Sequence, residues 1–424
     1  MSAGCAAAVL APPQYTGACS ALVGGLNRGD ALLANVPLKD VVAMGHGKAP
    51  RLLDKLMRDT GEPPWADYSA SRVGQSLWRA NLGAAFVSLM AALMLGFSIA
   101  RFAVVLVASG YTSSTDATWF RFRETGFAIM DWISFPLAPP KAGEEESSWA
   151  RRSIYRVRCL HELARRRALE KGTMHGAGVA LSQYDMAIVL LAFSGICISI
   201  MECEVGAPAL QGEERAAMVA TWRLIGWHLG IEDCFNACRS CAVLDATCAD
   251  FMASVPARFE SVGAETLELQ VAVARAFGAK LPVGVQWFLG WTDALLRSPY
   301  RPEWHAHTPS PRETRGLFTD AEPALAPLFG VSRAAWCCMR CIGPRRRSRL
   351  VGQHLLAMRE LHRTDPARAK RFEAKTLCLS RLFDCCVWPT VSALCRVAHC
   401  VRSCLTCACA HRRSKLLPAR DASM

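Results

Sequence analysis

The stretch WARRSIYRVRCLHELARRRALE, residues 149–170, decides the fold class predicted for this chain. Apolar or weakly polar side chains recur along it at steps of three and four, namely Ile154, Val157, His161, Ala164 and Ala168. This spacing places them on one face of an α-helix. We therefore predict a helix over the whole stretch, with His161 on its inward face. The arginines that flank this face are Arg151, Arg152, Arg158, Arg165 and Arg166.

Other segments repeat the helical pattern, and strand signals are few. Further helices are expected over residues 116–134, 181–200, 212–231, 264–280, 283–297 and 351–379. The segment 181–200 is apolar nearly all round, which is typical of a helix in the centre of a core. The sequence therefore predicts an all-α fold.

Composition divides the chain of 424 residues into three regions. Residues 1–65 are rich in Gly, Ala and Pro and show no sustained periodicity, so we expect a loosely ordered lead-in. Residues 66–334 carry most of the helical patterns and are long enough to bury a sizeable core. Residues 335–424 form a basic, cysteine-rich C-terminal extension.

One apolar segment raises the question of a membrane span. Residues 82–100 contain no charged side chain, and a helix needs about 20 apolar residues to cross a bilayer. A helix buried in a large all-α core gives the same pattern. Both interpretations remain open from the sequence.

The net charge of +13 lies largely in residues 343–349 and 411–415, with another basic cluster over 151–167. No nucleic-acid motif accompanies these runs, so we expect no nucleic-acid partner. The N-terminus lacks the charged start of a secretory signal, which favours an intracellular protein with reduced thiols.

The cysteines allow more than one interpretation. Three pairs have the spacing of zinc knuckles, namely Cys238 with Cys241, Cys338 with Cys341, and Cys404 with Cys407. The first pair, together with Cys234, also fits a stripe of small apolar residues on a helix. The segment from Cys400 to His411 is the better zinc candidate. The same basic tail also suits S-palmitoylation and contact with an anionic membrane, or carries its cysteines incidentally.

Charged residues interrupt the apolar segment RFRETGFAIMDW, residues 121–132. Arg121, Glu124 and Thr125 lie there, although a buried charge is costly unless it is paired. Either this face is solvated, with Arg121 and Glu124 forming an ion pair three residues apart, or it meets a polar guest.

His161 is the other candidate for chemistry. The sequence HELAR, residues 161–165, lacks the second histidine of a zinc protease, and we see no phosphate-binding glycine loop or serine nucleophile elbow. A neutral imidazole directed into an apolar cavity is what a haem iron needs as an axial ligand, and the flanking arginines would suit haem propionates. A satisfied core histidine fits the same pattern.

The order of five motifs, VLVASG, RFRETGFAIMDW, VRCLHELAR, LSQYDMAIVLLAFS and TWRLIGWHLGI, resembles a known family. It is the catalytic domain shared by rubber oxygenase, the latex-clearing protein, and the endoplasmic-reticulum-bound oxygenase of mycophenolic acid biosynthesis. The resemblance covers roughly residues 70–330. It implies a globin-like helical core that encloses one b-type haem.

The resemblance also implies roles for individual residues. His161 matches the proximal iron ligand, and Arg121 and Thr125 match residues that line the distal side of the haem. The positions that match structural or haem-shell residues are Gln183, Asp185, Trp222, Arg223 and Gly226. Rubber oxygenase has a lysine just before the threonine, whereas this chain has Glu124, which would suit a catalytic acid or base.

The family chemistry would be the oxidative cleavage or oxygenation of an alkene in a lipophilic, prenyl-like chain, with dioxygen as co-substrate. Such a substrate would favour an intracellular enzyme associated with a membrane, for instance the endoplasmic reticulum. The alternative is a haemless, membrane-associated helical binding protein that keeps the fold, with the cysteine-rich tail as a lipid-anchored or zinc-binding module.

Overall fold

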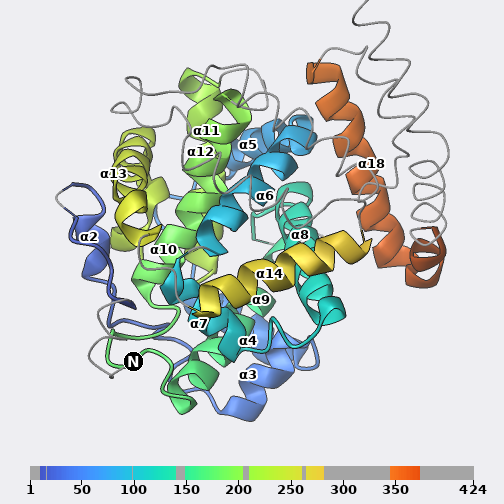
Figure 1. The fold of residues 1–424 in the computed structure, drawn as a ribbon. Helices are drawn as coiled ribbons and strands as arrows, with labels where there is room; N and C mark the ends of the chain where they lie inside the picture. The colour runs from blue at the N-terminus through green and yellow to red at the C-terminus, as the bar shows by residue number, and fades with distance from the viewer. Residues whose placement is uncertain are drawn as a thin grey trace, which may run out of the picture.

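The computed structural model describes residues 10–15, 17–97, 99–139, 149–203, 210–259, 264–280 and 344–372. Every regular element in these ranges is a helix, which confirms the predicted all-α class (Figure 1). The first helices are α2 (Ser20–Val23), α3 (Leu38–Gly45), α4 (Pro50–Thr60), α5 (Tyr68–Ala80), α6 (Leu82–Phe97), α7 (Ala100–Ala108) and α8 (Thr115–Ser134). The later helices are α9 (Trp149–Glu170), α10 (Gln183–Leu191), α11 (Cys197–Cys203), α12 (Gly212–His228), α13 (Cys241–Phe259), α14 (Ala264–Lys280) and α18 (Pro344–Thr364). The short elements are the π-helix η2 (Ala192–Ile196) and the 3-10 turns η3 (Asp233–Phe235) and η4 (Ala237–Arg239).

Sequence periodicity located the long helices well. Helices α8, α9 and α14 cover the predicted ranges 116–134, 149–170 and 264–280 almost to the residue. Helix α18 begins at Pro344, before the predicted start at 351. The prediction for residues 283–297 falls outside the described residues.

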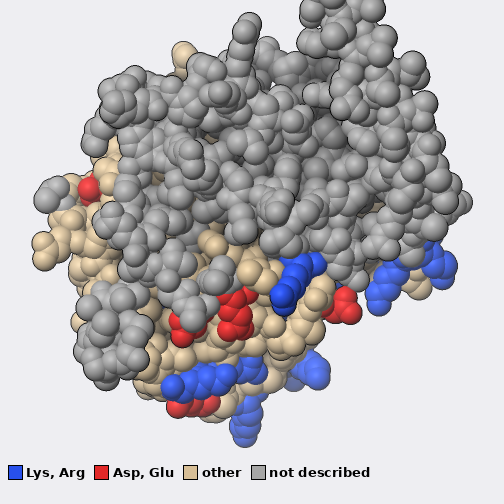
Figure 2. Space-filling model, viewed as in Figure 1, with Lys and Arg blue, Asp and Glu red and all other residues tan. Residues whose placement is uncertain are grey.

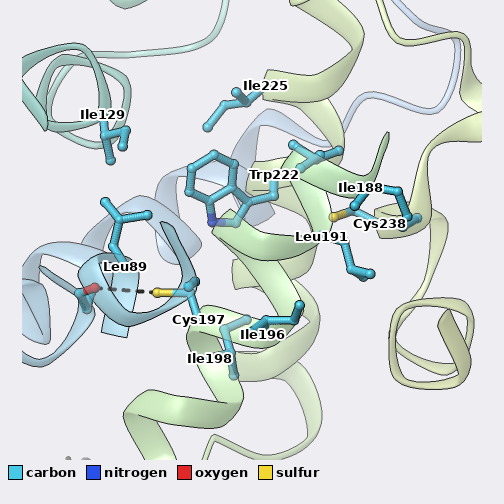
Figure 3. Packing of buried hydrophobic residues seen from close by; sticks show 14 of the residues in the cluster. Leu89, Ile129, Ile188, Leu191, Ile196, Cys197, Ile198, Trp222, Ile225 and Cys238 are labelled. Carbon is cyan, nitrogen blue, oxygen red and sulfur yellow. Dashed lines mark hydrogen bonds between the residues drawn. The ribbon is translucent and has the colours of Figure 1, made fainter. Parts of the chain in front are cut away.

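The segment predicted to be central does form the centre of the core. Helix α10, the π-helix η2 and helix α11 follow one another without a break, and Leu191, Ile198 and Met201 are fully buried. Figure 3 shows these helices meeting Trp222 of α12 and Leu89 of α6. In the described ranges, Gln183–Glu202 is the one helix long and apolar enough for a membrane span, and 83% of its most apolar window is buried inside the protein.

The apolar segment 82–100 is divided between two helices. Helix α6 ends at Phe97 and helix α7 begins at Ala100. Leu89, Met94 and Leu95 of α6 are at most 7% exposed and belong to the main core. The described part of this segment is therefore buried in the helical core, as the second sequence interpretation expected.

The N-terminal region differs from the predicted loose lead-in. Its described residues contain α2, α3 and α4, and α3 and α4 pack against α9. The hydrophobic cluster at this contact comprises Leu33, Val41, Met44, Leu53, Leu56, Tyr155, Cys159 and Leu163. Asp30 adds a buried ion pair to Arg158 of α9, with N–O distances of 2.5 and 2.8 Å. This region is therefore ordered by its contacts with α9, which lies more than a hundred residues later in the sequence. Local periodicity cannot reveal contacts over that distance.

The described surface carries charges of both signs. On the face that Figure 2 shows, Lys and Arg side chains alternate with Asp and Glu side chains along the lower edge. Surface charges mixed in this way interact weakly and favour solubility.

Candidate functional site

A cavity of about 470 Å³ lies between α6, α7, α8, α9 and the central α10–η2 segment. Its volume falls within the roughly 300–1,000 Å³ of typical ligand sites. Apolar side chains form most of its wall, among them Leu93, Phe97, Phe102, Val105, Phe127, Ile129, Met186, Val189, Phe193, Ile196 and Trp222. The four sequence candidates, Arg121, Glu124, Thr125 and His161, also line this cavity.

Helix α8 presents three of these candidates. The Ser114 hydroxyl caps the helix by accepting a hydrogen bond from the Ala117 amide at 3.0 Å. Phe122, Ile129 and Ile133 of the same helix are at most 7% exposed and anchor it in the core, and Phe122 and Ile129 also line the cavity. This anchoring fixes the rotation of α8, so that residues 121, 124 and 125 face the cavity.

The charged pair on α8 answers the question that the apolar segment raised. Arg121 and Glu124 are exposed and line the cavity, and no ion pair joins them in the described structure. The Thr125 hydroxyl donates a hydrogen bond to the Arg121 carbonyl at 3.1 Å. The two charges therefore lie where the cavity meets solvent, so this face is solvated, although the two residues do not form the ion pair expected with it.

His161 projects from α9 beside Val157 and Ala164, which also line the cavity. Its Nδ1 is buried and has no hydrogen-bond partner. Burial, with a smaller effect from the nearby Arg165 cation, lowers the pKa of His161 to about 4. The imidazole is therefore neutral near pH 7, and a neutral imidazole keeps the lone pair that a metal ligand needs.

The arginines that flank His161 in the sequence are paired with carboxylates, and Arg152 is the one of these five that lines the cavity. Each has a carboxylate partner: Arg151 pairs with Glu62, Arg152 with Asp54, Arg158 with Asp30, and Arg165 and Arg166 with Glu162. The pairs with Asp30, Asp54 and Glu62 attach α9 to the N-terminal region. Their role is structural because a guanidinium paired in this way has less attraction for another anion.

Gln183 and Asp185 organise the start of α10. Asp185 completes a capping box with Ser182 and forms a buried ion pair with Arg101, with N–O distances of 2.5 and 3.1 Å. The Gln183 amide donates hydrogen bonds to the Gly29 and Gly230 carbonyls at 3.2 and 2.8 Å. Both residues therefore hold the central helix against its neighbours.

The second polar signature, on α12, is also largely structural. Arg223 forms two hydrogen bonds with Asp233, at 3.0 and 2.7 Å, and stacks 3.8 Å above the Trp65 ring. At Gly226 a Cβ atom would lie only 2.8 Å from the Leu190 side chain. Trp222 is different, since it lines the cavity and packs edge-on against other tryptophans.

Sequence reasoning missed a cavity residue from α18. Arg359 lines the cavity and pairs with Asp131 of α8, which also lines it. The two residues are 228 positions apart, and α18 lies in the region predicted to be an extension. The sequence predicted a helix over residues 351–379, but only the packing shows that it reaches this wall.

The described residues offer few side chains that could bind a metal ion together. No group of three or more His, Cys, Asp or Glu side chains lies close enough to hold a metal ion within the described ranges. Haem iron needs only one or two protein ligands because the porphyrin nitrogens supply the other four. His161, with its lone pair and apolar surroundings, fits that requirement.

The first cysteine group does not form the predicted stripe on one helix. Cys234, Cys238 and Cys241 lie on η3, on η4 and at the start of α13 respectively. Cys238 donates to the Ser194 hydroxyl at 3.3 Å, and burial raises the pKa of its thiol to about 12. The other knuckle pairs, and the segment from Cys400 to His411, lie outside the described residues.

A helical fold around an apolar cavity with one inward, neutral histidine is the architecture of a protein that binds a cofactor or an apolar substrate in its interior. The chain belongs to the family described as ER-bound oxygenase mpaB/B'/Rubber oxygenase, catalytic domain, whose model matches residues 77–336. No curated protein and no solved structure matches the chain. Family membership confirms the sequence resemblance and makes the protein an oxidoreductase of the oxygenase class. The match includes all four candidate residues and ends before α18.

Proposed function

We propose that the protein is a haem-b-dependent oxygenase that cleaves or oxygenates an alkene in a lipophilic, prenyl-like substrate. One observation carries the proposal: His161, neutral and without a hydrogen-bond partner at Nδ1, lines an apolar cavity together with Arg121, Glu124 and Thr125. An apolar cavity suits the apolar macrocycle of haem, and the exposed charges of α8 suit the polar edge of the haem.

His161 would hold the iron as the proximal ligand, and Arg121 and Thr125 would position the haem from α8. Bound haem would supply the redox chemistry that activates dioxygen. The apolar wall from α6, α7 and η2 would bind the substrate chain and exclude water, which protects a reactive centre from side reactions.

Glu124 is the candidate for proton transfer. It lines the same cavity one turn after Arg121, and no cation pairs with it in the described structure. A carboxylate in this position would accept or donate a proton at Oε1 or Oε2 during turnover.

The location of the enzyme is part of the proposal. An intracellular enzyme at a membrane such as the endoplasmic reticulum would meet lipophilic substrates directly, and the family description includes an ER-bound oxygenase. The basic, cysteine-rich tail, which lies outside the described residues, would assist through S-palmitoylation or contact with an anionic leaflet.

The test is the absorption spectrum of the purified full-length protein, with haem quantified per chain. The wild-type protein should show a Soret band at near one haem per chain, and His161→Ala should lose or shift this band. The matched control is His46→Ala, because His46 is an exposed histidine that does not line the cavity. A colourless wild-type protein, even after expression with added haem, would contradict the proposal and favour the haemless binding protein.

A further inference from the structure

The arginines of the cavity wall differ in their partners. Among the described residues the lining contains Arg101, Arg121, Arg152, Arg156 and Arg359. Three of them are neutralised, Arg101 by Asp185, Arg152 by Asp54 and Arg359 by Asp131. Arg121 and Arg156 have no carboxylate partner within the described ranges. The lining also contains one unpaired carboxylate, that of Glu124, so the unpaired side chains of the described wall carry one positive charge in excess for an anionic guest.

Arg156 contacts the C-terminal end of α3. It lies on α9 five residues before His161, and its Nε donates to the Gly45 carbonyl at 3.4 Å. Gly45 ends α3, so the guanidinium sits at the negative end of that helix. The following turn contains Gly47 at φ +71°, where a Cβ atom would lie 3.4 Å from Arg156 Cζ. The α3 terminus therefore supports Arg156 without neutralising it.

The exposure of the two free arginines indicates which part of a guest they meet. Both side chains are exposed although they line the cavity, so they lie at its opening. Haem b has an apolar macrocycle and two propionate carboxylates on one edge. A carboxylate loses less hydration at an opening than in the interior, and arginine binds carboxylates in a charge-assisted, often bidentate manner.

We propose that Arg156 binds one haem propionate, while Arg121 takes the other. This inference rests on the proposed haem function and adds a cofactor-positioning residue to it. In place of the five flanking arginines of α9, it assigns the propionate to Arg156, an arginine of that helix that lines the cavity and has no carboxylate partner in the described ranges.

The test measures haem affinity by titrating the haem-free full-length protein and following the Soret band. Haem and haem dimethyl ester, in which both carboxylates are blocked, are compared on the wild type, Arg156→Gln and Arg156→Lys. Arg167→Gln is the matched control, since Arg167 is an exposed arginine of the same helix that does not line the cavity.

Arg156→Gln should weaken haem binding about tenfold, the value of one charge-assisted hydrogen bond, and leave binding of the dimethyl ester unchanged. Arg156→Lys should weaken haem binding less, and Arg167→Gln should match the wild type. Equal haem affinity in Arg156→Gln and the wild type would overturn the inference and leave the haem function standing. An equal loss of both ligands in Arg156→Gln would also overturn it. Failure of the wild type to bind either ligand would instead contradict the proposed function.

Discussion

Arg359 of α18 forms a two-bonded ion pair with Asp131 of α8, with Nε–Oδ1 and Nη2–Oδ2 distances of 2.8 and 2.7 Å. The Asp131 side chain is 4% exposed, and the guanidinium also lies 5.0 Å from the centre of the Phe127 ring. All three residues line the cavity. A helix outside the matched catalytic domain therefore completes the wall of the site.

The first prediction concerns this ion pair. Arg359→Ala should lower the free energy of unfolding by roughly 3 kcal/mol, because it leaves a nearly buried carboxylate without its cation. Adding Asp131→Asn should recover part of the loss, since a neutral amide costs less to bury. Urea denaturation measures both effects. Arg363→Ala is the control, because the pair of Arg363 with exposed Glu360 should contribute about 1 kcal/mol or less.

The second prediction is a pH dependence of stability to which His228 contributes. This residue is fully buried and shares a hydrogen bond of 3.0 Å with the Tyr155 hydroxyl. Burial, followed by the charges of Arg151 and Arg158, lowers its pKa well below the ordinary 6.5. The unfolded chain therefore binds a proton more readily, and stability should fall as the pH drops below about 6.5.

The urea midpoints at pH 7.5 and 5.5 measure this dependence. His228→Gln should show a smaller drop between the two pH values than the wild type. His46→Gln, at an exposed histidine, should behave as the wild type does. An unchanged drop in His228→Gln would contradict the assignment.

The third prediction concerns the contact between α5 and α12. A Cβ atom on Gly74 would lie 2.1 Å from the Ala217 carbonyl oxygen, a backbone atom that cannot move aside without shifting the helix. Gly74→Ala should therefore destabilise the protein by about 3 kcal/mol. Gly96→Ala provides the matched control, because Gly96 is also helical and nothing lies within 4 Å of its Cβ position. That variant should be neutral or more stable by up to about 1 kcal/mol. Thermal melts of the two variants give the comparison.

The fourth prediction tests Glu124 within the proposed oxygenase. Glu124→Gln should reduce kcat by about 10²-fold or more with a small change in KM, because the amide keeps the shape and cannot transfer a proton. Oxygen consumption with an alkene substrate measures the rate, and the pH profile should lose one limb. An unchanged kcat and pH profile would exclude proton transfer by this residue.

The helices and their inward faces were predictable because helical periodicity is local. The stripe through Ile154, His161 and Ala168 marked the face of α9 that meets the core and the cavity. The apolar face of α8 was equally visible, through Phe122, Ile129 and Ile133. Contacts within four residues decide such patterns, so the sequence alone is sufficient for them.

The partners of the charged residues were not predictable. Nothing near Arg158 in the sequence indicates that Asp30 will bury its charge, and nothing near Asp131 indicates Arg359. The sequence also does not show that Arg156 lacks a carboxylate partner in the described ranges while its neighbours Arg151, Arg152 and Arg158 each have one.

The sequence by itself therefore determined the all-α class, the main helices and the apolar surroundings of His161. The tertiary structure decided which arginines stay free at the cavity, how α18 closes its wall and how the N-terminal region is held against α9. The physical reason is distance along the chain, since ion pairs and helix contacts between remote segments depend on how the helices pack, while periodicity reports only neighbours within a turn.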